Sequence, residues 1–104
     1  MIIANRGDTI IANIVIKDKT TGEIYVPEAT DTLRFALKKD YSDRKVLIYK
    51  EIPIDTMQLR IESEDTKKLD QPGMYYYDIQ LTYGDGIVDT VIPNAKLKIV
   101  EEVE

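Results

Sequence analysis

The sequence predicts an all-β fold, an antiparallel β-sandwich of about seven or eight strands with one short helical turn near residues 64–69. Stretches of alternating apolar and polar residues recur along the chain, and turn residues separate them about every ten positions. One of these stretches carries three consecutive tyrosines directly after a Pro-Gly turn. At 104 residues the chain suits a single domain, residues 1–104.

The first third of the chain predicts two strands joined as a hairpin. Residues 9–17 form a β-branched run that is apolar on one face and mixed on the other, as in a well-buried strand. Residues 18–22 supply turn residues, including a glycine, and residues 23–26 return as a short strand. Pro27 stops this strand because proline cannot donate a ladder hydrogen bond.

Three further strands follow before any helical signal. In residues 33–38 apolar and polar positions alternate, and Phe35, the only Phe, is expected at the centre of the core. A polar loop at residues 40–45 leads to a strand near a sheet edge, because Pro53 blocks pairing close by. The two later strands are predicted at residues 46–50 and 57–62.

The helical turn and the tyrosine strand follow each other directly. Ser63 can cap the turn, early charges are acidic and later ones basic, and Pro72-Gly73 ends it. In the strand after Gly73, alternation places one set of side chains on the core face: Tyr75, Tyr77, Ile79 and Leu81. This spacing is that of the tyrosine corner of immunoglobulin-like sandwiches, in which the phenol bonds to upstream backbone. Tyr75 is the predicted corner residue, and Tyr77 takes the place of the second cysteine; an ordinary core strand is the alternative.

The last quarter predicts a hairpin and a final strand. Asp85-Gly86 favours a tight turn, after which residues 87–92 return as a strand. Residues 93–95 are expected to break the ladder before a last strand at residues 96–100 and an acidic tail at residues 101–104.

Composition argues against most enzyme designs. The chain has no Cys and no His, so it lacks thiol catalysis, thiolate metal sites, disulfides and the commonest general base. A net charge of −5 argues against nucleic acid, and no apolar run suggests a membrane span. Residues 1–10 show no signal peptide, which indicates a cytoplasmic protein that can still become part of a released particle. We expect no enzymatic activity and no cofactor.

Three motifs allow a functional interpretation, and each has a structural alternative. Arg6-Gly7-Asp8 spells a receptor-recognition tripeptide, yet it leads straight into a strand and is better interpreted as a turn. The carboxylate pairs Asp40 with Asp43 and Asp85 with Asp89 do not match an EF-hand loop, so solvated turn acids are expected rather than a Ca²⁺ site.

The face of the tyrosine strand opposite the core is the better candidate for contact with a partner. It carries Met74 and Tyr76, residue types that are enriched in protein interfaces, although a covering loop could bury them. Tyr41, Tyr49 and Tyr83 could alternatively form a platform on which sugars stack.

Several short motifs together resemble a family of phage proteins. They are Arg6-Gly7-Asp8-Thr9, Asp65-Thr66 with Leu69 and Gly73, Tyr75-x-Tyr77-Asp78-Ile79, and Thr90. This pattern is similar to small domains of phages and prophages of Gram-positive bacteria, and above all to the amino-terminal domain of the siphophage baseplate upper protein. The resemblance implies an immunoglobulin-like structural module, found in the virion tail, with no catalytic residues to transfer.

The resemblance also implies the partners, which are other tail or baseplate proteins or a host-recognition protein, with a homo-oligomer as a further option. In that family a longer fibre or receptor-binding protein follows the domain, whereas no stalk follows Glu104 here, which leaves open a free-standing component, an adaptor or a piece of a larger protein. The alternative function is a carbohydrate-binding or adhesion module.

Overall fold

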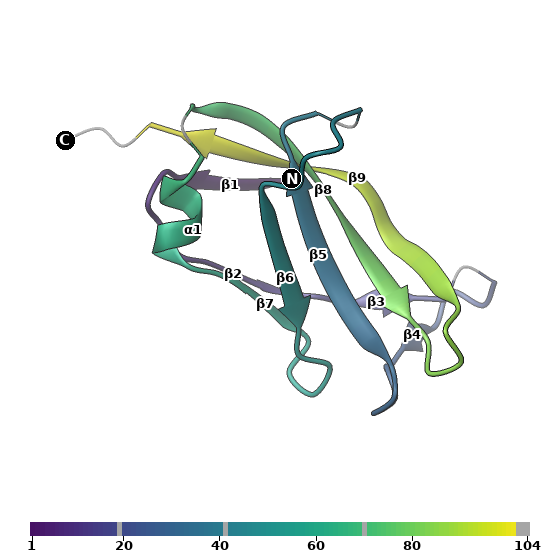
Figure 1. Cartoon of the computed structure of the whole chain (residues 1–104). Helices are drawn as coiled ribbons and strands as arrows, with labels where there is room; N and C mark the ends of the chain where they lie inside the picture. The colour runs from purple at the N-terminus through teal and green to yellow at the C-terminus, as the bar shows by residue number, and fades with distance from the viewer. Residues whose placement is uncertain (19, 41, 70, 102–104) are drawn as a thin grey trace.

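The computed structural model describes residues 1–18, 20–40, 42–69 and 71–101, which are predominantly β (Figure 1). In chain order, the elements within these ranges are β1 (Ile2–Asn5), β2 (Ile10–Asn13), β3 (Ile16–Lys17), β4 (Ile24–Tyr25), β5 (Thr32–Lys38), β6 (Ile48–Ile52), β7 (Gln58–Ile61), α1 (Ser63–Lys67), β8 (Gly73–Thr82) and β9 (Val88–Val100). The all-β prediction and the short helical turn before the tyrosine strand are confirmed.

The strands form one large sheet and two small ones. The five-stranded sheet has the order β1-β9-β8-β5-β6, and β2 pairs with β7 and β3 with β4 as two-stranded sheets. All pairs are antiparallel except β1 with β9, which run parallel. The predicted antiparallel pairing is therefore found in every pair except this one. The four residues of β1 had not been expected to form a strand, because their partner lies at the far end of the sequence.

Within the described residues, the strands differ from the expected seven or eight because β1 is added, one predicted strand is divided, and the last two predicted strands are joined in β9. Residues 9–17 form both β2 and β3, which pair with different partners, β7 and β4. Between them the Ile14 amide donates to the carbonyl of Met57 at 2.8 Å, so the chain changes sheet there. The predicted hairpin at residues 18–22 is confirmed by the pairing of β3 with β4.

β9 is one strand of 13 residues, so the separate last strand predicted at residues 96–100 is wrong. The ladder is nevertheless interrupted near the predicted place, because Tyr77 pairs with Ala95 and Ile79 with Ile92, and the pairing skips residues 93 and 94. The pairing of β9 with β8 shifts register between Tyr77 and Ile79 and again between Ile79 and Gln80. Such β-bulges leave a residue outside the ladder, so they tolerate a proline, which has no amide hydrogen to donate. The strand predicted at residues 46–50 is displaced to β6, which ends just before Pro53.

The core lies on one face of the five-stranded sheet and includes side chains from the other sheets. Phe35 is fully buried at its centre, as predicted. The β2–β7 pair contributes Ile10, Leu59 and Ile61 to the same cluster, and β3 contributes Ile16. Figure 1 shows α1 at one end of the molecule and the β3–β4 pair at the other, next to the β8–β9 hairpin.

Candidate functional site

Tyr75 lies at the start of β8 and is 3% exposed. Its hydroxyl donates a 2.6 Å hydrogen bond to the carbonyl of Gln71, four residues upstream, as the corner interpretation requires. The ammonium group of Lys39 lies 4.4 Å from the centre of its ring, within range of a cation–π contact. Tyr75 therefore ties the start of β8 to the segment before it and has a structural role.

Tyr77 is half-buried on the same face of β8. Its ring packs against Phe35, with 5.2 Å between the ring centres and a tilt of 40°. Burial raises the pKa of its phenol. This aromatic contact joins two adjacent strands of the five-stranded sheet.

Met74 and Tyr76 lie on the outer face of the five-stranded sheet, opposite the core, and both are half-buried. In register, Tyr76 stands between Lys38 of β5 and Lys96 of β9, and Met74 stands opposite Lys98 of β9. We call these five side chains the lysine–tyrosine patch. None of them belongs to the buried core cluster, so the patch faces outward.

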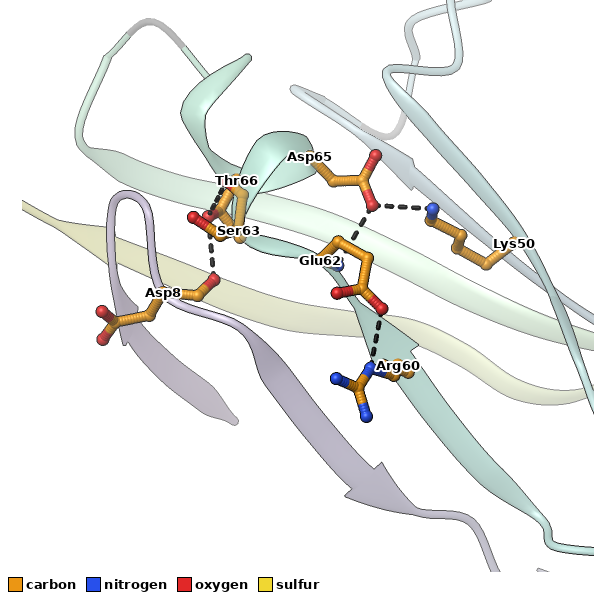
Figure 2. A network of polar contacts seen from close by, with 7 residues as sticks. All are labelled: Asp8, Lys50, Arg60, Glu62, Ser63, Asp65 and Thr66. Atoms are coloured by element: carbon orange, nitrogen blue, oxygen red, sulfur yellow. Dashed lines mark hydrogen bonds and ion pairs between the residues drawn. The ribbon is translucent and has the colours of Figure 1, made fainter.

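The Arg6-Gly7-Asp8 segment is a turn between β1 and β2 that contacts α1 (Figure 2). The fully buried hydroxyl of Thr66 accepts the Gly7 amide at 3.0 Å and donates to the Asp8 carbonyl at 2.9 Å. Arg6 donates to the carbonyls of Lys67 and Leu69, where α1 ends. The tripeptide thus forms part of the turn's contact with α1, and the Asp8 carboxylate points away from α1 in Figure 2.

The capping of α1 differs from the prediction. Glu62 is the N-cap, and its amide donates to the Asp65 carboxylate at 3.1 Å, while Ser63 donates instead to the carbonyl of Gly7. Burial opposes ionisation of Asp65, but Lys50 at 2.7 Å and the Glu62 amide together hold the pKa of this carboxyl below its ordinary value. Ser63 was therefore wrong as the cap, because the turn with Gly7 engages its hydroxyl.

A second polar cluster lies at the opposite end of the molecule and was not predicted. The buried carboxylate of Asp31 accepts the Tyr25 hydroxyl at 2.7 Å and the amides of Glu28 and Gly84 at 2.9 and 3.0 Å. The hydrogen bond from Tyr25 is the main cause that lowers the pKa of Asp31, and the same bond raises the pKa of Tyr25 to about 12. Tyr83 meets Tyr25 edge to face, with 5.9 Å between ring centres.

These two tyrosines line a hollow of about 470 Å³ together with Asp18, Asp89 and Lys17, among others. We call it the tyrosine hollow. Burial raises the pKa of Tyr83, and the carboxylates of Asp89, Asp18, Asp31 and Asp85 add to the effect. The environment of Tyr83 is therefore strongly anionic. A cation could meet both carboxylates and an aromatic ring there.

A smaller apolar hollow of about 120 Å³ lies beside the β3–β4 pair. Its rim includes Val15, Ile24 and Val26, whose exposed fractions are 56%, 66% and 73%. Apolar side chains exposed in this way are often found where proteins meet.

The remaining sequence candidates are not brought together. Tyr83 packs against Tyr25, while Tyr49 lies on β6 with 58% of its surface exposed, and Tyr41 lies outside the described residues, as do Asp70 and residues 102–104. Asp40 and Asp85 each accept a nearby backbone amide in a turn, as expected of turn acids. Across the described ranges, no three His, Cys, Asp or Glu side chains are grouped so that they could hold a metal ion.

Within the described residues, no helix is long and apolar enough to cross a membrane. A scan against protein-family models found no match to this chain, and searches of curated proteins and of solved structures found none either.

Sequence reasoning missed the cluster of Tyr25, Asp31 and Tyr83 because its members come from three separate loops and strand ends. The only local signal was Asp31 three residues after Glu28, the spacing at which the acidic side chain of a capping box accepts an upstream amide. The approach of Gly84 to Thr30, where an added Cβ would collide with the threonine side chain, depends on the tertiary fold alone.

Proposed function

We propose that this chain is a non-enzymatic structural module of a phage or prophage tail or baseplate, which works by contact with other proteins of the particle. The phage assignment depends on the motif resemblance described above. The observation that carries the assembly role is the lysine–tyrosine patch, since Met and Tyr side chains on an outward sheet face are material for interfaces.

We further propose that the fold is a disulfide-free immunoglobulin-like sandwich. Support comes from the bond between the Tyr75 hydroxyl and the Gln71 carbonyl, and from the β2–β7 pair sharing one core with the five-stranded sheet. Tyr77 packs on Phe35 within the core, although the two rings belong to adjacent strands of one sheet and do not join two sheets as the disulfide of antibody domains does.

The test combines particle proteomics with direct binding. After prophage induction in the source strain, we expect the protein in purified particles. We also expect the purified protein to bind at least one purified tail or baseplate protein. The double variant Met74→Ala/Tyr76→Ala should weaken that binding about tenfold or more. The matched control is Ile87→Ala, whose side chain is 61% exposed in the β8–β9 hairpin. Absence from particles together with no binding to tail proteins would refute the proposal.

One observation favours the alternative of a carbohydrate-binding module. The tyrosine hollow combines two aromatic rings with carboxylates that can accept sugar hydroxyls. A glycan array tests it: binding that is lost in Tyr83→Ala supports a carbohydrate site, and an array without signal dismisses it.

A further inference from the structure

The charges of this acidic chain are unevenly distributed along β8. At its start, Lys38 and Lys96 flank Tyr76 in register, and Lys98 stands opposite Met74. The three lysines thus gather on one part of the outer sheet face, although the whole chain carries a net charge of −5. Lys38 lies on β5 and the other two lysines on β9, on either side of β8, so their positive charges share one part of this face. A surface that brings acidic groups to them is favoured.

The opposite end of β8 has the complementary chemistry. The tyrosine hollow is open to solvent, and Asp18 and Asp89 line it beside the rings of Tyr25 and Tyr83. Lys17, which is positively charged, also lines it. Glu28 and Asp85 line an adjoining hollow that shares both tyrosines. A lysine side chain entering there would meet carboxylates and an aromatic face together.

We propose that the lysine–tyrosine patch of one copy of this chain docks onto the tyrosine hollow of a second copy. The inference rests on the proposed assembly function and names the partner as the same chain. The patch and the hollow are separated by about 24 Å of strand, the rise of seven residues from Tyr76 to Tyr83. The two surfaces of one molecule therefore cannot meet each other, whereas the patch of one copy can meet the hollow of another.

The contact joins two different surfaces, so it is head-to-tail rather than two-fold symmetric. Each copy then keeps one unused patch or one unused hollow, and association continues until a ring closes or a filament forms. Since the contact depends on charges near the surface, added salt should weaken it.

Sedimentation velocity of the full chain over a range of concentrations tests the proposal. We expect association that increases with concentration and decreases with salt. Lys38→Glu/Lys96→Glu should weaken it about tenfold or more. Arg44→Glu/Lys45→Glu changes the net charge equally in an exposed loop and should leave it unchanged. Circular dichroism checks that each variant is folded.

A charge exchange makes the test specific. Glu28→Lys/Asp89→Lys should also weaken self-association, because two carboxylates that would face the patch are then replaced by lysines, which repel it. Mixed in equal amounts, the patch variant and the hollow variant should associate again, since the introduced glutamates of one then meet the introduced lysines of the other. A monomeric wild type, a patch variant that associates like wild type, or a mixture that stays monomeric each overturns the inference. A monomeric wild type that still binds a tail protein overturns the inference alone and leaves the proposed function intact.

Discussion

Two tyrosine hydroxyls hold loops in place through single hydrogen bonds, and neither bond is a feature of regular secondary structure. Tyr75 bonds to the carbonyl of Gln71 before β8, and Tyr25 bonds to the carboxylate of Asp31 before β5. Because the phenol is rigid and its stem is apolar, a tyrosine can pack against the core while its hydroxyl reaches backbone or carboxylate oxygens. Both bonds can be removed without disturbing ring packing by substitution with phenylalanine.

For Tyr75→Phe we expect a loss of about 1 kcal/mol in the free energy of unfolding, the typical net contribution of such a bond. Urea denaturation measures it. The control is Tyr49→Phe, whose side chain is 58% exposed on β6 and should change stability by less than about 0.5 kcal/mol. Equal effects of the two substitutions would show that the bond to Gln71 contributes nothing specific.

The hydrogen bond between Tyr25 and Asp31 predicts that the free energy of unfolding depends on pH in the alkaline range. The pKa of Tyr25 is raised from 10.0 to about 12, so the folded state holds the phenol proton more tightly than the unfolded state. Its contribution to stability is complete below pH 10 and is lost as the pH rises through the folded pKa. In Tyr25→Phe, stability should fall less between these pH values than in the wild type. Unfolding at a series of alkaline pH values measures the difference, and parallel curves would contradict the assignment.

The lowered pKa of Asp31 predicts that stability also depends on pH in acid. Its pKa is lowered from 3.8 by the Tyr25 hydroxyl and by the amides of Glu28 and Gly84, so its contribution is present above the unfolded pKa and is lost as the pH falls through the folded pKa. Asp31→Asn should therefore reduce the acid sensitivity of unfolding. If the acid sensitivity of the variant is unchanged, other carboxylates determine how stability falls at acid pH.

At the scale of elements, α1 is held mainly by contacts outside itself. A helix of five residues is too short to be stable alone, and its buried Thr66 and its carboxyl end are bonded to the turn at Arg6, Gly7 and Asp8. The turn and the helix therefore order each other, and through them β1 and β2 are attached to the segment that leads into β8.

Thr66→Val tests this coupling. Valine keeps the shape of threonine but removes the hydroxyl, leaving the Gly7 amide and the Asp8 carbonyl without their partner. We expect a loss of about 1–3 kcal/mol in the free energy of unfolding. Thr66→Ser keeps the hydroxyl and should cost less than Thr66→Val. If the serine variant is the less stable of the two, the methyl group of Thr66 rather than its hydroxyl stabilises the contact between α1 and the turn.

How much the sequence predicts follows from the range of each interaction. The alternation in β5 and β8 and the turn at Asp85-Gly86 are local, so the core face of both strands and the hairpin between β8 and β9 were predicted. The pairing of β1 with β9 and the meeting of Tyr25 with Tyr83 join distant segments, and no local pattern indicates them. Met74 and Tyr76 were identified from alternation alone, whereas the lysines around them depend on the register of three strands.

At the scale of the whole molecule, the elements differ strongly in how they are supported. β5 and β8 are each paired on both sides, and their Leu33, Phe35 and Ile79 side chains are completely buried. The β3–β4 pair has two residues in each strand, and Ile24 within it is 66% exposed. Ile16 is the residue of this pair in the buried core cluster, so we expect this end of the molecule to open without unfolding the rest.

Native-state hydrogen exchange should therefore follow the sheet order rather than the sequence order. We expect the slowest amide exchange at the centre of β5 and β8, since it requires global unfolding, and exchange at least about a hundredfold faster in β3 and β4, which needs only local opening. β1 should lie between these limits, because it pairs with β9 at the sheet edge yet is joined to α1 through Arg6. Exchange in β3 and β4 as slow as in β5 would mean that the bonds among Tyr25, Asp31 and Gly84 join that end to the core as one cooperative unit. Asp31→Asn would then be expected to speed exchange throughout the chain instead of only around the tyrosine hollow.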